Sequence, residues 1–374
     1  MTLQVKIIGD NEREFWDQTV ANLPHSHPFN AYGWGKVREI DGWTPTYFVA
    51  KEGDVVKGMI MVLHKKIPWT GLSIMYAPKG PVCNPSDHET IESIIEEVKK
   101  EGRKKRSIFL RIDPNMPEIL LKDLTDSFIN LGFTHLQNRW SFWNSPRDVY
   151  RIDFGAVGSE DELFKALDRD TRRCIRKATK EGLTIVSAES IDELQQFYEI
   201  FKNFSIEKKF LSRDYKYQLA LWNEFIVKGN GRLFLAVYEE KIIGGLICLM
   251  FGGKCVAMHM GTPQKYNKLH SYYAYVWESI CWAKKNGCMW YSFRGVGSTP
   301  TQERFKRKFN PKFVQLVGYY DLPFKPILYR IFYFLEMYAL PKTVWIYKRI
   351  IRSISGFRTR LRKFLKFSTH FNYW

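Results

Sequence analysis

The chain has 374 residues, more than one ordinary hydrophobic core accommodates, so we expect two domains. Hydrophobic residues make up 45% of it and aromatic residues 16%, which excludes an intrinsically disordered chain. The formal net charge of +18 indicates anionic partners such as nucleic acid, anionic lipid or phosphorylated substrates.

The opening residues and the cysteines predict a cytoplasmic protein. Residues 1–16 are polar and charged, unlike a secretory signal, and no apolar run is long enough for a transmembrane helix. The six cysteines form no C-x-x-C pair and lie mostly in apolar runs. We therefore expect reduced core cysteines, with neither disulfides nor a metal site. Nothing in the sequence calls for a metal or a cofactor.

The first predicted elements are a short amphipathic helix over 11–24 and a loop leading into a helix over 29–43. The second of these stretches is dense in glycine and aromatic residues, and Lys36 lies just past its glycines. Two interpretations of Lys36 remain open. It is either a solvated surface lysine or a cation held beside a ligand phosphate.

Strands and one helix follow over 45–114. Ser86 is the predicted start of the helix, with a capping box to Glu89. The last strand of this stretch ends at Asp113, directly before a proline. A carboxylate there is either a turn former or a group that orients or deprotonates an amine.

A helix-and-strand segment over 116–153 leads to a helix that we expect from Ser159 to Gly182. Its basic residues recur at i, i+3, i+4, i+7, i+8 and i+11, which places them on one face without an acid. These residues are Arg169, Arg172, Arg173, Arg176, Lys177 and Lys180. The face is either simply solvated or a contact surface for RNA or phosphate.

A third capping box, from Ser190 to Glu193, predicts a helix that runs towards Phe210. Arg213 and Tyr217 then lie four residues apart, on one side of any helix that follows.

The stretch from 232 to 297 has the order strand–turn–strand–strand–helix–strand, and 45–114 has the same order. Residues 48–63 also parallel 234–249, with an alanine and a glycine eight residues apart in both. Two copies of this length indicate duplicated domains and not a solenoid.

The end of the chain is basic. A loop and short helix over 298–309 carry Phe305 and Lys306, and an amphipathic segment covers 323–340. From Leu322 onwards there are eleven lysines and arginines but only one acid, Glu336. This composition is typical of an interfacial helix on an anionic membrane, although a disordered basic tail has it too.

The order of strands and helix resembles the GNAT N-acyltransferase core, an α/β fold with mixed sheets. Acyl-CoA members of that group hold the pyrophosphate on backbone amides of a glycine-rich turn at a helix N-terminus. The corresponding turn of the second copy, 262–268, has no glycine, and prolines remove donors from 80–85 in the first. We therefore expect a different acyl donor.

Several motifs make the chain similar to one family, the FemABX peptidyltransferases. They are Trp34-Gly-Lys36, Tyr76-Ala-Pro-Lys-Gly-Pro81, Thr171-Arg-Arg-Cys-Ile-Arg-Lys-Ala178, Trp277-Glu-Ser-Ile-Cys-Trp-Ala-Lys-Lys-Asn-Gly287 and Phe305-Lys306. Members of this family use aminoacyl-tRNA to build the side-chain bridge of peptidoglycan. The resemblance implies tandem GNAT-like domains, one from 1–150 plus about 312–335 and one from 151–311. A basic amphipathic tail, 336–374, follows, and we expect no coiled-coil arm.

The resemblance also implies roles for individual residues. Lys36 and Arg213 would bind the phosphates of the substrate, and Tyr217 would help to seat it. Lys306, with Phe305, would face the aminoacyl ester, where a cation stabilises the developing oxyanion. Asp113 would lie near the acceptor amine. The tRNA would contact the basic face through Arg172, Arg173, Arg176 and Lys177.

Three positions depart from the family pattern. Tyr291-Ser-Phe293 stands where relatives commonly carry Tyr-Asp-Phe, and Asn30 stands where glutamine is usual. Met258 and His259 replace an aromatic residue expected near the end of the preceding strand.

The sequence thus predicts a monomeric aminoacyltransferase at the inner face of the plasma membrane. It would move an amino acid from aminoacyl-tRNA to the side-chain amine of lipid II or UDP-MurNAc-pentapeptide, without a covalent enzyme intermediate. Two alternatives remain open. One is a CoA-dependent N-acyltransferase acting on a cell-envelope sugar or peptide, and the other is a non-catalytic RNA- or membrane-binding homologue.

Overall fold

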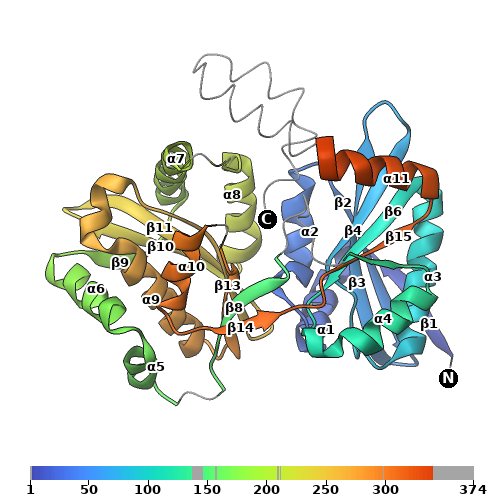
Figure 1. The fold of residues 1–374 in the computed structure, drawn as a ribbon, viewed down its shortest axis with the longest axis horizontal. Coiled ribbons are helices and arrows are strands. Elements are labelled where there is room, and N and C mark those ends of the chain that lie inside the picture. The colour runs from blue at the N-terminus through green and yellow to red at the C-terminus, as the bar shows by residue number, and fades with distance from the viewer. Residues whose placement is uncertain are drawn as a thin grey trace. The chain divides into compact units, whose positions relative to one another are not determined.

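The computed structural model describes residues 2–136, 146–155, 158–208, 210, 212–297 and 299–339. It divides into two compact units (Figure 1). The first unit combines the described residues of Met1–Asp10, Asp41–Ser145 and Val317–Trp374. The second combines those of Asn11–Ile40 and Pro146–Leu316. The tail predicted over 336–374 lies outside the described residues except for 336–339.

Residues 11–40 belong to the second unit, whereas the expected first domain, 1–150, included them. They contain the end of η1 (Asp10–Glu12), followed by α1 (Arg13–Asn22), η2 (Pro28–Asn30) and α2 (Tyr32–Glu39). Within the second unit, Arg13 forms an ion pair with Glu224 at 2.8 Å, and α2 packs against α8 (Tyr215–Leu221). These contacts join partners about two hundred residues apart, which local sequence patterns do not reveal.

The first unit is built on a mixed sheet with the order β1-β2-β3-β4-β6-β15-β7, in which β5 pairs with β3. Only β4 and β6 run parallel among these neighbours. The strands are β1 (Leu3–Ile8), β2 (Thr44–Glu52), β3 (Val55–Ile67), β4 (Leu72–Lys79), β5 (Val82–Cys83), β6 (Ser107–Pro114), β7 (Thr134–Leu136) and β15 (Tyr319–Pro323).

Helices cover both faces of this sheet. Leu110 and Ile112 of β6 face a core shared with α3 (His88–Lys104) and α4 (Leu121–Asn130). Phe109 and Arg111 alternate to the other face, where α11 (Pro326–Phe334) and η6 (Leu335–Ala339) lie (Figure 1). The short η3 (Glu118–Leu120) precedes α4.

The capping residue of α3 differs from the prediction. Asp87, and not Ser86, is the N-cap, and its carboxylate accepts from the Thr90 amide at 3.1 Å and the Thr90 hydroxyl at 2.8 Å. The capping box from Ser86 to Glu89 was therefore wrong. An aspartate one position later binds the same helix end with a charged acceptor.

The second unit has a seven-stranded sheet with the order β14-β8-β13-β12-β11-β10-β9. Here β12 and β13 are the parallel pair. The strands are β8 (Asp148–Asp153), β9 (Thr184–Ser187), β10 (Gly231–Tyr238), β11 (Lys241–Phe251), β12 (Lys254–Gly261), β13 (Trp290–Gly295) and β14 (Lys312–Gln315).

In this unit α9 (Ser271–Lys285) covers one face of the sheet and α7 (Ile191–Glu207) the other. The remaining helices are α5 (Glu160–Ala166), α6 (Arg169–Lys180), η4 (Trp222–Ile226), η5 (Gln264–Leu269) and α10 (Pro300–Arg307). The single helix predicted from Ser159 to Gly182 is thus two helices. The chain turns at Leu167, and Asp168 caps α6 by accepting from the Asp170 amide at 2.9 Å. The capping boxes at Ser159 and Ser190 are confirmed.

The internal duplication is confirmed down to the register of the hairpins. Both copies have the order of three strands, one helix and one strand, and the first adds the two-residue β5 before its helix. Ala50 pairs with Gly58 in the first copy, and Ala236 pairs with Gly244 in the second. The register shifts directly after the alanine in each hairpin. A bulge at the same position indicates that the copies share backbone geometry as well as element order.

All six cysteines are free and buried, as expected for core residues. No helix in the described part of the chain has both the length and the apolar character needed to cross a bilayer.

Candidate active site

The two parallel strands of the second unit pair over only part of their length. Their ladder runs from Lys254 opposite Trp290 to Val256 opposite Ser292. His259 on β12 and Arg294 on β13 both lie beyond the last pair, at the carboxyl ends of the strands. Ligands of open α/β sheets bind at such carboxyl ends, which makes the charged side chains there candidates for a binding site.

Arg213 and Tyr217 flank one side of this region. Arg213 precedes α8, and its guanidinium lies 4.5 Å from the centroid of the Tyr217 ring. Both side chains are buried, at 4% and 2% exposure. The Tyr217 ring centroid is 5.9 Å from that of His259. The structure therefore confirms that Arg213 and Tyr217 share one side of a helix start, and it adds His259 as their neighbour.

His259 carries a neutral imidazole. Burial, followed by the charges of Arg294 and Arg213, lowers its pKa to about 3. Its Nδ1 lies 3.1 Å from Oε1 of Gln218, a fully buried side chain on α8. The sequence indicated His259 only as a departure from an aromatic pattern. That His259 lies near two cations, Arg213 and Arg294, could be seen only in the folded structure.

Lys306 also lies at the carboxyl end of β13. Its Nζ donates to the carbonyl oxygen of Phe293 at 3.1 Å and also to that of Gly295. Burial, followed by the charge of Arg294, lowers the Lys306 pKa to about 8. Arg294 influences both Lys306 and His259, so these groups belong to one electrostatic cluster. The cluster of Arg213, His259, Arg294 and Lys306 is called the cation cluster below.

Phe305 explains why Lys306 points into the cation cluster. Its ring lies 5.2 Å from the ring of Tyr273 and 5.4 Å from that of Phe309, centroid to centroid. These contacts fix α10 against the core of the second unit. The next residue in the helix, Lys306, is thereby turned towards the end of β13.

Lys36 lies on α2, which packs against α8 and η4. Its ammonium group is 3.3 Å from Glu39 and 5.8 Å from the centroid of the Tyr32 ring. The Lys36 side chain is 27% exposed, so a ligand can reach it. The helix that carries Lys36 thus adjoins the helix that carries Tyr217. Its binding of phosphate stays a prediction.

Asp113 belongs to the first unit, where its carboxylate is engaged on both oxygens. Oδ1 accepts from the Tyr76 hydroxyl and the Lys79 amide, each at 2.9 Å. Oδ2 forms an ion pair with the Lys79 ammonium group at 2.8 Å. These contacts tie the end of β6 to the end of β4. A catalytic role for Asp113 stays a prediction.

The basic face of α6 forms as expected, with Arg173, Arg176 and Lys177 exposed and Arg172 half-buried. It is not free of acids, because Arg173 pairs with Asp170 at 3.2 Å. Arg176 lies 5.2 Å from the ring centroid of Phe164. The face therefore keeps a surplus of positive charge, and its contact with tRNA stays a prediction.

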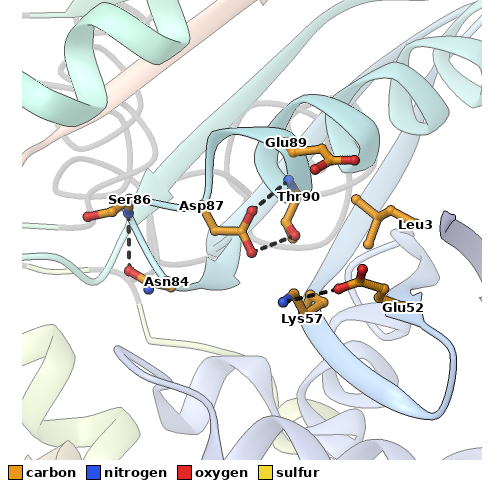
Figure 2. A pocket seen from close by; sticks show the side chains of 8 residues that line it. All are labelled: Leu3, Glu52, Lys57, Asn84, Ser86, Asp87, Glu89 and Thr90. Carbon is orange, nitrogen blue, oxygen red and sulfur yellow. Dashed lines mark hydrogen bonds and ion pairs between the residues drawn. The ribbon is translucent and has the colours of Figure 1, made fainter. Parts of the chain in front are cut away.

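The positions that would hold the phosphates of CoA do not suit a polyanion in either unit. In the second unit, the Thr262 amide after β12 donates to the Tyr272 hydroxyl at 2.9 Å. In the first, a pocket of about 340 Å³ lies at the N-terminus of α3 (Figure 2). Three carboxylates line it, from Glu52, Asp87 and Glu89. Its one cation, Lys57, is paired with Glu52 at 3.3 Å. A polyanionic cofactor is repelled by such a lining.

In the described ranges, no three histidine, cysteine, aspartate or glutamate side chains form a group that could hold a metal ion.

Solved structures with the same architecture define the class of this protein. The crystal structure of FemX has a TM-score of 0.80 and 16% identity, and the match covers 88% of this chain and 99% of that one. A tandem GNAT protein from the clavulanic acid biosynthesis pathway has a TM-score of 0.52 and 9% identity, covering 86% and 98%. The chain is therefore a tandem GNAT-fold protein with mixed α/β sheets.

A family model narrows this class. The model of the FemAB family matches residues 12–238 and 232–337, and the chain belongs to that family. The resemblance drawn from the sequence motifs is thereby confirmed.

Curated relatives include a lipid II:glycine glycyltransferase of Staphylococcus haemolyticus (strain JCSC1435), 26% identical over 228 residues. A protein of the same name from Staphylococcus aureus is 23% identical over 228 residues. Each match covers 60% of this chain, but only 54% and 53% of the respective relative, so the chain spans about half their length.

Proposed function

We propose that the chain is an aminoacyltransferase that moves an amino acid from aminoacyl-tRNA to the side-chain amine of a peptidoglycan precursor. The observation that carries the proposal is the cation cluster, in which Arg294 acts on both Lys306 and the neutral imidazole of His259, and Arg213 acts on that imidazole as well. The names of the relatives, lipid II:glycine glycyltransferases, support this class of acceptor and reaction.

The proposed reaction is the aminolysis of an ester. The acceptor amine attacks the ester carbonyl carbon, a new amide bond forms, and the ester C–O bond breaks. The ribose hydroxyl of the tRNA leaves with a proton that the amine loses. Negative charge develops on the carbonyl oxygen in the transition state, and a cation fixed nearby stabilises it. Lys306 is our candidate, because a lysine with a pKa of about 8 is mostly protonated at pH 7.

The other predicted residues have supporting roles in this proposal. Arg213 and Lys36 bind the phosphates of the acceptor, and Tyr217 seats it. Phe305 faces the aminoacyl ester beside Lys306. The tRNA body contacts the basic face of α6, at Arg172, Arg173, Arg176 and Lys177. Long-range attraction between that face and the RNA backbone supports this assignment.

We further propose that the protein acts as a monomer in the cytoplasm, at the inner face of the plasma membrane. Lipid II, a lipid-linked acceptor, is the one named for the relatives, and a water-soluble UDP-linked acceptor remains compatible with the same site. CoA-dependent transfer is the less favoured reaction, since the acidic pocket at α3 and the engaged Thr262 amide both oppose CoA binding.

A transfer assay tests the proposal. The protein is mixed with radiolabelled aminoacyl-tRNAs and with either lipid II or UDP-MurNAc-pentapeptide, and acetyl-CoA serves as a parallel donor. We expect label on the muropeptide from tRNA and none from acetyl-CoA. The Lys306→Ala variant should lose at least about a hundredfold in rate, the usual cost of removing one oxyanion-stabilising group.

Arg304→Ala is the matched control, because Arg304 is an exposed cation on the same helix, α10. Its rate should equal that of the unmodified protein. Acetyl transfer without aminoacyl transfer would refute the assignment of the donor. Equal loss in both variants would refute the role of Lys306.

A further inference from the structure

The helix formed by α11 and η6 has one face committed to the sheet of the first unit. The Tyr329 hydroxyl donates to Asp321 at 2.9 Å, and the Phe332 ring centroid lies 5.0 Å from that of Phe109. Glu336, one turn further on, is 2% exposed. These residues follow a helical spacing and define the inner face of the helix.

A buried ion triad fixes this helix in rotation. Arg111 donates to Asp321 through Nε and Nη2, each at 2.7 Å. It also donates to Glu336, at 2.6 Å from Nη1 and 3.0 Å from Nη2. All three side chains are at most 2% exposed. If the helix rotated about its axis, Arg111 and Asp321 would lose the charge of Glu336 as a partner in the interior, which is destabilising. The opposite face of the helix therefore stays on the surface.

That outer face is apolar and exposed. Its members occupy i, i+4, i+7 and i+11, one stripe along the helix. They are Ile327 at 75% exposure, Ile331 at 52%, Phe334 at 59% and Tyr338 at 60%. Single exposed apolar residues are ordinary, but a continuous row of four marks an interaction surface. This row is called the outer row below.

Charge around the outer row identifies its occupant. Lys325 and Arg330 are exposed on the same helical segment, whereas its only acid, Glu336, points inward. The sequence that follows, 340–374, has nine lysines and arginines and no aspartate or glutamate. An apolar stripe with cations beside it and a basic sequence after it is complementary to an anionic lipid surface.

We propose that α11 and η6 dock on an anionic membrane, with the outer row inserted at the boundary between headgroups and acyl chains. Lys325 and Arg330 then contact lipid phosphates. The ion triad of Arg111, Asp321 and Glu336 keeps the outer row on the surface of the protein. The helix lies on the bilayer and does not cross it. This inference rests on the proposed function in one respect: an enzyme docked on the membrane can reach a lipid-linked acceptor. The docking itself requires no substrate.

Vesicle binding by the full-length protein tests the proposal. Sedimentation with vesicles of phosphatidylcholine alone is compared with that on vesicles containing phosphatidylglycerol. We expect binding only to the anionic vesicles. The double variant Ile331→Glu, Phe334→Glu should bind at least about tenfold more weakly, because binding scales with buried apolar area as well as charge. Ile129→Glu is the matched control, an apolar residue 53% exposed on α4, and should bind normally.

Three outcomes would overturn the proposal. The first is unchanged vesicle binding by the double variant, which would show that charge alone, without the outer row, accounts for the binding. The second is a dimer of the unmodified protein in sedimentation velocity that the double variant lacks, which would make the row a self-association surface. The third is no binding to anionic vesicles at all.

A second readout separates this proposal from the proposed function. Transfer to the water-soluble UDP-linked acceptor should be the same in the double variant and the unmodified protein. If no transfer occurs in either, the proposed function fails while the vesicle result still stands. Equal far-UV circular dichroism and unfolding temperature show that the double variant is folded.

Discussion

Arg294 should control the protonation of Lys306, and removing its charge tests the electrostatics of the cation cluster. The Lys306 pKa is lowered from 10.5 to about 8, by burial first and by Arg294 second. If the cationic form is the active one, the transfer rate, once divided by the deprotonated fraction of the acceptor amine, should fall about tenfold per pH unit above pH 8. In Arg294→Gln the midpoint of this fall should move upward. It should stay below 10.5, because burial, the larger cause, remains.

Two measurements check this expectation. The pH dependence of transfer to the UDP-linked acceptor gives the midpoint in activity, and competitive acetylation of lysines with mass-spectrometric readout gives the Lys306 pKa directly. The titration of the acceptor amine is common to all variants, so differences between variants report the enzyme. Arg304→Gln removes an exposed cation from α10 and should leave the midpoint in place. A midpoint in Arg294→Gln that is unchanged or lower would refute the reasoning.

Three further predictions concern stability. Arg111→Met should lower the free energy of unfolding by about 3–5 kcal/mol in denaturant titrations, since Asp321 and Glu336 lose their counter-charge in the interior. His259 has a pKa of about 3 in the fold against 6.5 ordinarily, so the unfolded state binds the extra proton and stability falls as pH drops below about 6.5. His259→Gln should flatten that fall in thermal unfolding scans. If Asp113 and Lys79 form a purely structural ion pair, Asp113→Asn and Lys79→Met should lower stability by about the same amount and leave kcat nearly unchanged. A large loss of kcat in Asp113→Asn alone would instead support the predicted catalytic role of Asp113.

Much of the fold could be predicted because its signals are local. The hairpins are set by turn residues between apolar runs, and the eight-residue spacing from Ala50 to Gly58 and from Ala236 to Gly244 is the cross-strand pairing itself. The capping boxes at Ser159 and Ser190 follow from residues three apart. Where two local candidates competed, as Ser86 and Asp87 did, the pattern alone chose the wrong one.

What could not be predicted depends on contacts between distant residues. Arg111 meets Asp321 and Glu336 across 210 and 225 positions, and no periodicity carries that information. The pKa of Lys306 on α10 depends on burial and on Arg294, which lies on β13. The sequence could nominate Lys306 through a family motif, but its environment follows only from packing.

The two copies of the fold differ at the place where chemistry is expected. In the first unit, the parallel strands β4 and β6 stay paired up to Lys79 opposite Pro114, and an ion pair between Asp113 and Lys79 links them at that end. In the second, the ladder of β12 and β13 ends at Val256 opposite Ser292, and the cation cluster lies beyond it. We infer that duplication produced one copy that is closed between its parallel strands and one that is open. In the proposed reaction the ester binds at the open copy, where the cations of the second unit can stabilise the oxyanion, whereas a role for Asp113 near the acceptor amine stays a prediction.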